Sequence, residues 1–509
     1  MILPDQVNLA EIAYLAFQAD EEMERQARIV KARELEAGYF DSDLASELQD
    51  KALLGGVAAD IEGVNMVSVA LNTLLRRVSL QSVTTSDEEQ TTWLQRISRA
   101  NKLLKIQRKL HRAAVRDGRA FLAVEYDDYK RQFWNPEQRG LPRFYVHERY
   151  TDPSVTYGDT NGSGEGCRAF YRNDDSDQEL EMVAKRWTET IYENNEPATR
   201  QRMTLYIAEQ FENPARVEKY VMDDSGEWAQ HSDERRDESG AVVSEEWPIW
   251  WTVDGSETGE SLPLPIFVFS NEEDQPAFKR AWGLQAGMDQ MWSAMLSGGT
   301  LTGHQLLVAL GFVPTTDGKP PAEDDSNLMV SRPRQIIGTA VEKNKADMKH
   351  IPPADPRAII DVMDKISIYF ALVTGLPLKN FTFTRQVSSG EALRHGEVEL
   401  VASANELSDL FEPEWIDAFN LARKLENLFG NSGHDWAEDL EIAIQWAPKE
   451  TVSQEVKKDE VDAKLAAGVP QEQIQEDVFG YSAEEIQQNA ARNGSGERET
   501  AVSSAGGAE

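Results

Sequence analysis

Apolar residues recur at helical spacing in two central stretches of the chain. In the first, after Pro276, they stand four, three and four positions apart: Leu284, Met288, Met291 and Met295. The second follows Asp355-Pro356, a capping residue and a proline suited to the first helical position. Its stripe consists of Ile359, Met363, Ile366, Phe370 and Val373. Each stripe is typical of one buried helix face, so we expect two helices that pack side by side and form the contacts between copies of the chain.

The segment between these helices, 304–345, has a different pattern. Two strand-like runs, HQLLVALGF and LMVSRPRQIIG, flank a loop rich in Pro, Gly and Asp. We expect a small β unit whose edge strands pair across copies, with a charged loop that contains Asp317, Lys319, Glu323, Asp324 and Asp325. The pattern fits a stalk with a knob at its end and an ordinary helical hairpin with an inserted β arm equally well.

Outside this region, helical and strand-like patterns alternate. A basic amphipathic helix is predicted over 91–116, with the stripe Leu103, Ile106, Leu110 and Ala113 and a stop at Asp117-Gly118. A strand at 120–126 and short β-branched or aromatic runs between 143 and 270 follow. A long helix over 391–429, which Pro413 kinks or restarts, precedes a strand near 440–446. The order of these elements predicts an α+β fold.

The segment 378–387 must be a loop, since Gly375-Leu376-Pro377 stops one helix and the capping box Ser388-x-x-Glu391 starts the next. Its candidate site residues are Lys379, Asn380, Phe381, Thr382 and Arg385. Two interpretations remain open. The loop is either a short edge strand whose phenylalanines pack inward, or a projection whose cations touch phosphates transiently and without sequence preference.

The net charge of the chain argues against some classes of binding partner. The chain has 509 residues, with 52 Lys+Arg against 88 Asp+Glu and a net charge of −36. Such an excess argues against a protein that coats nucleic acid, because phosphate neutralisation needs clustered cations. A negative wall past which DNA slides is compatible with it, and solubility alone is the plainer explanation.

Targeting and redox signals are sparse. The one cysteine, Cys167, cannot form an intramolecular disulfide, which favours a reducing cytosol. No apolar run approaches the roughly 20 residues of a membrane helix, and no basic segment precedes an apolar one at the start of the sequence. We therefore expect neither a membrane anchor nor a signal peptide.

Nine cations between 94 and 119 accompany a single acid, Asp117. They predict either a surface that follows phosphates or a solvated helix face that balances acidic neighbours, and we favour the second. His111 is expected to be solvated on this polar face. No Walker A, dinucleotide-binding or HExxH motif is present, and the seven histidines lack metal-ligand spacing. We expect no catalytic residue, metal or cofactor, and read NGSGEG at 161–166 as a plain turn.

The order of elements and several short segments resemble portal proteins of tailed double-stranded DNA bacteriophages, of the siphophage type, over roughly 55–490. The segments that carry the resemblance are NMVSVALNTLLRRVSL (65–80), HRAAVRDGRAFLAVEYDD (111–128), LPLPIFVFSNEEDQPAF (262–278), TGLPLKNF (374–381), SSGEALR (388–394) and QEVKKDEVDAKLAAGVPQEQIQEDVFGYSAEEI (454–486). The acidic stretch 222–260 does not map onto the family pattern.

The resemblance implies a dodecameric ring with a central channel. It divides the chain into a wing (1–275), a first stem helix (276–303), a clip (304–345), a second stem helix (346–376), a tunnel loop (377–390), the long helix and strand of the wing (391–450), a crown (451–490) and a disordered tail (491–509). The two stripes would then be stem packing, and the charged loop would dock the motor and the connector.

The implied role is a conduit at one capsid vertex, through which DNA is packaged and ejected without sequence specificity. The implied partners are the terminase large subunit, which supplies the ATPase chemistry, the major capsid and scaffolding proteins, and the head-tail adaptor. The chain would be made in the host cytoplasm and reside in the virion. The alternatives are another oligomeric head-tail component of the virion and an acidic cytosolic enzyme whose site the sequence does not reveal.

Overall fold

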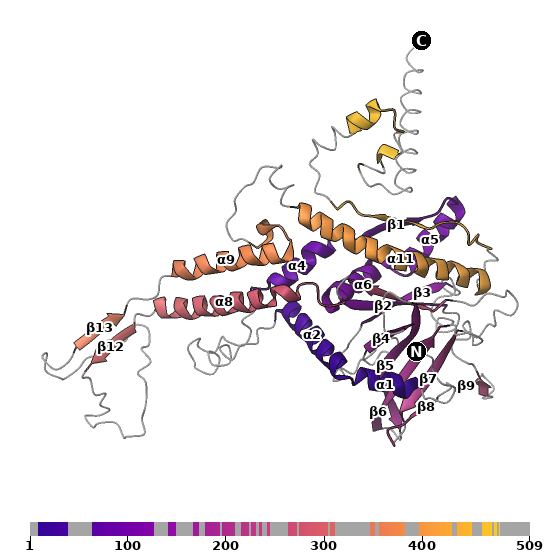
Figure 1. Cartoon of the computed structure of the whole chain (residues 1–509), viewed down its shortest axis with the longest axis horizontal. Coiled ribbons are helices and arrows are strands. Elements are labelled where there is room, and N and C mark those ends of the chain that lie inside the picture. Colours follow the sequence, from indigo (N-terminus) through magenta and orange to yellow (C-terminus); the bar gives the residue numbers. More distant parts are fainter. Residues whose placement is uncertain are drawn as a thin grey trace, which may run out of the picture. The chain divides into compact units, whose positions relative to one another are not determined.

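The computed structural model shows a chain of mixed α and β structure (Figure 1). It describes residues 9–38, 64–126, 141–148, 166–172, 179–193, 196–208, 215–222, 225–230, 234–236, 242–244, 263–271, 274–303, 306–310, 347–351, 356–381, 397–429, 435–449, 461–470, 473–475 and 478. Two compact units divide the chain. Unit 1 comprises 1–33, 71–279 and 387–509, and unit 2 comprises 34–70 and 280–386.

Unit 1 contains most of the strands. Its helices are α1 (Leu9–Phe17), α5 (Glu88–Ala100), α6 (Leu103–Asp117) and α11 (Val398–Phe429), while α2 (Asp20–Ala37) and α4 (Met66–Leu75) each cross a unit boundary. One sheet has the order β11-β2-β3 (Ile266–Ser270, Arg119–Tyr126, Pro142–Glu148). A second runs β4-β5-β6-β7-β8 (Gly166–Tyr171, Leu180–Glu193, Glu196–Ile207, Arg216–Met222, Trp228–Gln230). Unit 1 also contains two separate strand pairs, β1-β14 (Leu80–Thr84, Ala443–Trp446) and β9-β10 (Glu234–Arg236, Val242–Ser244).

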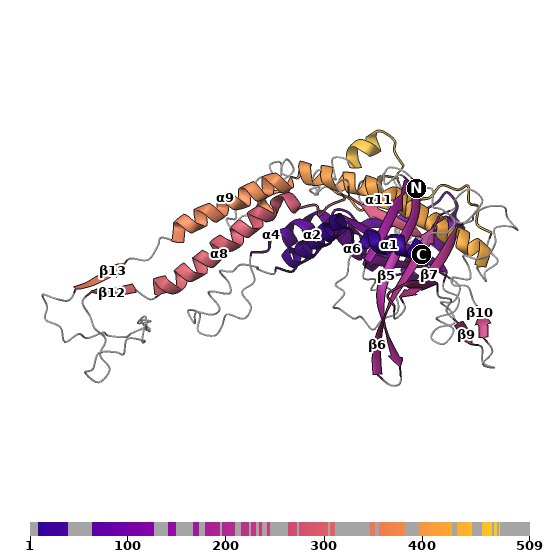
Figure 2. The same cartoon turned by 60° about the horizontal axis from the view of Figure 1, so that its bottom comes forward.

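The elements of unit 1 stack in layers. On one face of the three-stranded sheet, Phe121 and Val268 pack with Val183 and Tyr206 of the five-stranded sheet. On its other face, Phe269 of β11 meets the helix layer formed by α6 and α11. The far face of the five-stranded sheet is covered by α1, as Figure 2 also shows. The strands predicted at 120–126 and within 143–270 are confirmed, and the acidic stretch contributes β8, β9 and β10.

The predicted basic helix is wrong in one respect, because it is two helices. The amide of Asn101 donates to Ile97 O at 3.1 Å and to Pro142 O at 2.9 Å, and its oxygen accepts the Phe144 N–H. Lys102 adopts the left-handed conformation with φ of 54°. A side chain that satisfies backbone groups of a neighbouring strand competes with helix continuation, so the chain turns between α5 and α6.

His111 contradicts the sequence-based expectation, since it is buried in the core. Its Nδ1 lies 3.2 Å from Val78 O, and its Nε2 accepts the indole N–H of Trp415 at 3.0 Å. The ring stacks on Phe411 with centroids 4.9 Å apart. These two hydrogen bonds need a neutral imidazole that carries its proton on Nδ1, and burial lowers the pKa of His111 from 6.5 to about 4.

We expect this neutral histidine to make the protein less stable in mild acid. A lowered histidine pKa contributes stability that is complete above pH 6.5 and is lost as the pH falls toward 4. Between pH 7 and pH 5 the contribution should decrease by about 2 kcal/mol. Urea unfolding of the wild type and of His111→Gln at both pH values measures it.

The comparison of the two proteins is needed because other groups titrate in the same range. Burial raises the pKa of Glu414 to about 7 and that of Asp289 to about 6. Their raised pKa values work in the opposite direction, since the folded state then binds more protons as the pH falls. The wild type and His111→Gln both contain these carboxyl groups. If the free energy of unfolding depended on pH identically in the two proteins, the role assigned to His111 would be contradicted.

Gly118 ends α6 as predicted, with φ of +90°. A Cβ at this position would lie 2.7 Å from the Asp274 carbonyl carbon and 2.7 Å from the Gln275 nitrogen. We expect Gly118→Ala to lower the free energy of unfolding by roughly 2–3 kcal/mol. Gly226→Ala is the matched control, because Gly226 has φ of +84° with nothing within 4 Å. Equal losses in the two variants, measured by chemical denaturation, would show that the close approach is unimportant.

Unit 2 is built around two helices and a strand pair. Helix α8 (Trp282–Gly303), after the short 3-10 turn η5 (Lys279–Ala281), leads to β12 (Leu306–Leu310). Strand β13 (Asp347–Ile351) pairs antiparallel with β12 and leads back to α9 (Pro356–Thr374). Helices α8 and α9 lie side by side in Figures 1 and 2, which confirms the predicted helix pair.

Several predicted boundaries need correction. The range 346–376 is not helical throughout, because 347–351 is a strand. The first helix begins at Trp282 rather than near 276. In the long helix the described part starts at Val398, and it continues through Pro413 without ending there. Near the C-terminus, the helical turn at 461–466 is closed by Gly468 with φ of +79°, as expected.

Candidate functional site

The apolar stripes of α8 and α9 form the interior of the helix pair. Met288, Met363 and Phe370 are buried at 0%, 3% and 0% exposure. The other members of the two predicted stripes are half-buried: Leu284, Met291, Met295, Ile359 and Ile366. Val373 departs from the expectation, since it is 47% exposed. The structure thus brings the eight predicted packing residues to the buried side of their helices, with Met288, Met363 and Phe370 at the centre.

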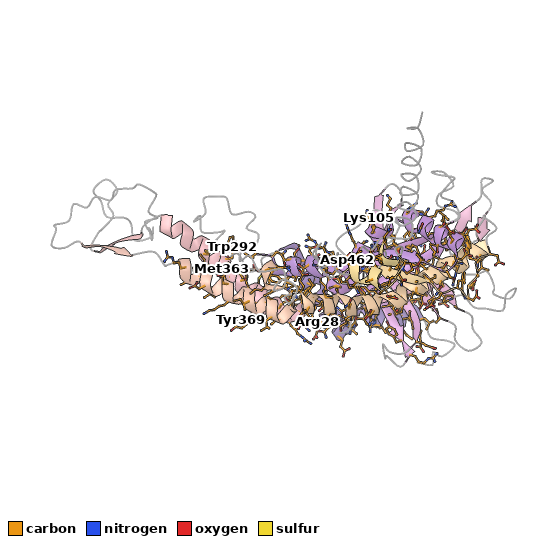
Figure 3. All side chains as sticks on the ribbon, turned by 90° about the horizontal axis from the view of Figure 1, so that it is seen from above. Arg28, Lys105, Trp292, Met363, Tyr369 and Asp462 are labelled. Atoms are coloured by element: carbon orange, nitrogen blue, oxygen red, sulfur yellow. The ribbon has the colours of Figure 1, made fainter. Side chains whose placement is uncertain are left out.

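A second side of α9 is apolar as well, but faces solvent. Leu372 is 75% exposed and Tyr369 is 57% exposed, and Figure 3 shows Tyr369 projecting from the helix pair. We call this surface the outer face of α9; it consists of Val362, Ile368, Tyr369, Leu372 and Val373. A helix that is apolar on two sides has a further surface to bury. The sequence contained this signal, because four of these residues fall outside the stripe that predicts the helix pair, and only Val373 belongs to it.

Polar side chains of α8 hold the segment that leads into α4. Gln285 accepts the Met66 N–H at 2.9 Å and donates to Val64 O at 2.8 Å. It also donates to Asp289 at 2.9 Å. Both side chains are buried, at 3% and 7% exposure. Spacing alone did not reveal this pair, because a polar residue on a helix is ordinarily assigned to the solvent face.

The loop after α9 begins with a short 3-10 turn, η6 (Leu378–Asn380). Phe381 follows it, buried, with its ring 5.0 Å from that of Phe370. Phe381 therefore packs inward, although in a turn rather than in an edge strand. Lys379 is exposed and Asn380 is half-buried. Thr382 and Arg385 lie outside the described residues.

The predicted clip is described only in part. Strand β12 pairs with β13 of the same chain, from Leu306 opposite Ile351 to Leu310 opposite Asp347. The expected pairing across copies would use the outer edges of this two-stranded sheet and stays a prediction. The five charged residues assigned to its loop lie outside the described residues: Asp317, Lys319, Glu323, Asp324 and Asp325. Their proposed contact with a motor stays a prediction.

The nine cations of 94–119 separate into two groups. Arg116 pairs with Asp117 at 2.7 Å and Arg119 with Asp274 at 3.1 Å, while Arg112 donates to Asn72 at 2.9 Å. Asp117 is also bound by Arg33 of α2 at 2.6 Å. Balance by acidic neighbours is thus confirmed for two of them. The other six side chains are exposed: Arg96, Arg99, Lys102, Lys105, Arg108 and Lys109.

The chain's one cysteine is not activated as a nucleophile. Burial raises the pKa of the Cys167 thiol to about 12, so that it stays protonated at neutral pH. No group of three or more His, Cys, Asp or Glu with the arrangement of a metal site occurs among the described residues.

No helix within the described ranges combines the length and the apolar composition needed to cross a bilayer. Neither a protein-family model nor a curated protein matches this chain.

Proposed function

We propose that this chain is the subunit of a ring-shaped portal of a tailed double-stranded DNA bacteriophage. The ring would occupy one capsid vertex of the virion, admit DNA during packaging and release it during ejection. The proposal rests first on the resemblance of the ordered segments between 55 and 490. It makes the helix pair the stem, the segment 304–345 the clip and α11 the long helix of the wing.

The observation that carries the proposal is the outer face of α9. One side of α9 packs on α8, and burial within one chain does not account for the exposed Tyr369 and Leu372 on the other side. Burying a large apolar side chain contributes roughly 1.5–3 kcal/mol when the burial is complete. Five such side chains on one helix therefore favour association of copies through this face. In a closed ring every copy offers such a surface to its neighbour.

The overall charge suits a conduit. A chain with net charge −36 gives a channel wall that repels phosphates and does not hold the duplex. The motor chemistry would belong to the terminase large subunit, and the loop after α9 would be the part of the wall nearest to the DNA. Lys379, exposed beside the buried Phe381, is the described residue that could touch phosphates there.

The test is the assembly state of the purified protein. We expect native mass spectrometry to give about twelve copies, the number that the resemblance implies, and negative-stain images to show rings with a central hole. The double variant Tyr369→Ser/Leu372→Ser should remain folded by circular dichroism and lose most of its rings. A wild-type protein that stays monomeric or dimeric at every concentration would contradict the proposed function.

A further inference from the structure

Exposed cations line the end of α5 and the outer side of α6. We call this surface the basic ridge; it consists of Arg96, Arg99, Lys102, Lys105, Arg108 and Lys109. Figure 3 shows Lys105 at an edge of the side-chain-covered surface. Leu104, 62% exposed, lies among these cations. Phosphate contacts use cations and polar groups and need no apolar side chain, so the exposed leucine favours a protein contact here.

Exposed carboxylates line α11 on the neighbouring helix. We call this surface the acidic ridge; it consists of Glu399, Glu406, Asp409 and Asp417. Leu410, 40% exposed, lies among them. The ridges thus carry opposite charges, each beside one exposed leucine, and Lys449 of the same chain lies near Asp409, whose charge raises the Lys449 pKa in opposition to burial.

Part of each ridge is turned away from the contact between α6 and α11. Helices α6 and α11 touch where His111 meets Phe411 and Trp415. At 3.6 residues per turn, Lys105 lies about 120° around α6 from His111 and Lys109 about 160°, whereas Arg108 lies about 60° and Leu104 about 20° from it.

On α11, Glu406 lies about 140° from Phe411 and about 180° from Trp415 by the same geometry. Lys105 and Lys109 of the basic ridge and Glu406 of the acidic ridge therefore lie on the sides of their helices that are turned away from the contact between α6 and α11. One copy cannot bring them together, whereas two copies placed head to tail can.

We propose that the basic ridge of one copy docks on the acidic ridge of the next copy. This inference rests on the proposed function, because it supplies a second contact for the same ring. Copies with net charge −36 repel one another, and a ridge of six cations aligned with carboxylates offsets that repulsion locally and fixes the orientation of the neighbour. Leu410 would add an apolar contact beside the charges.

The experiment uses two charge-reversed full-length variants. One carries Lys105→Glu, Arg108→Glu and Lys109→Glu, and the other carries Glu399→Lys, Glu406→Lys and Asp409→Lys. At low salt each variant alone should lose at least about tenfold of its assembled fraction, because like charges then meet at every contact. An equimolar mixture should recover the assembled fraction, because alternating copies present opposite charges at every contact. Native mass spectrometry should find the two variants in equal numbers.

Two controls accompany the reversed variants. Lys31→Glu reverses an exposed cation on α2 and should assemble like the wild type. The neutral variant with Lys105→Gln, Arg108→Gln and Lys109→Gln guards against misfolding of the reversed ones, and its assembly should depend less on salt than that of the wild type.

The outcomes separate this inference from the proposed function. Normal assembly of both reversed variants while the wild type forms rings would overturn the ridge contact and leave the proposed function standing. Failure of the mixture to recover, with both variants folded, would overturn the head-to-tail pairing. Normal assembly combined with lost retention of a duplex DNA oligomer would assign the basic ridge to nucleic acid instead. A wild type that forms no ring would refute both proposals.

Discussion

Replacing Trp415 by alanine is expected to lower the free energy of unfolding of the protein by roughly 3–5 kcal/mol, the usual cost of removing a large buried aromatic side chain. Trp415 is fully buried, and its ring lies 5.3 Å from that of Phe269 and 6.0 Å from that of Phe419. Its indole also supplies the hydrogen bond to Nε2 of His111. Urea unfolding followed by circular dichroism at neutral pH measures the loss.

Trp415→Phe separates packing from hydrogen bonding. Phenylalanine keeps much of the aromatic volume but leaves Nε2 of His111 without a donor, which should cost about 1–3 kcal/mol. A loss in Trp415→Phe as large as that in Trp415→Ala would mean that the hydrogen bond, rather than the packed ring, accounts for the stability at this position.

The second large effect is expected at the centre of the helix pair. Met363 is 3% exposed, so Met363→Asp places a carboxylate where no water can solvate it. We expect a loss of about 3–5 kcal/mol in the stability of the helix pair. Hydrogen exchange of the α8 and α9 amides is the measurement, because it reports on this unit separately from the rest of the chain.

Leu372→Asp is the matched control on the same helix. Leu372 is 75% exposed, so its substitution should change stability by no more than about 0.5 kcal/mol. It should nevertheless reduce self-association if the outer face of α9 contacts a neighbour. Rapid exchange in both variants would show that α9 tolerates no charge on either side, and would contradict the division into a packed and an outer face.

Local signals were sufficient where the structure depends on neighbours in sequence. Three such signals are the apolar stripe that contains Met288, the proline at the start of α9 (Pro356) and the glycine at the end of α6 (Gly118). Each acts within a few residues, and the helices follow from them. Strand β2 was predicted for the same reason, since its apolar run begins at Ala120, two residues after Gly118.

The sequence-based expectations failed where the environment of a residue is set by a partner far away in the sequence. His111 stands between Arg108 and Arg112 and looks solvated, but its burial depends on Trp415, 304 residues away. Likewise the break at Asn101 depends on a strand 41 residues later. The polar contacts of Gln285 depend on Val64, 221 residues earlier. Spacing within one helix carries no information about such partners.

The pairing of β1 with β14 has a consequence for how the protein is made. Ser82 and Gln445, joined by a 2.8 Å hydrogen bond between their side chains, are 363 residues apart. At the usual 5–20 residues per second, a ribosome needs roughly 20–70 seconds to supply the second strand after the first has emerged. For most of that time the side of α6 that carries His111 is uncovered, because α11 (Val398–Phe429) has not yet been synthesised. The nascent chain therefore exposes apolar surface for longer than a protein whose paired strands are consecutive in sequence, and chaperones must protect it from aggregation during that time. Expression at a lower temperature, where aggregation is slower, should raise the yield of folded chains.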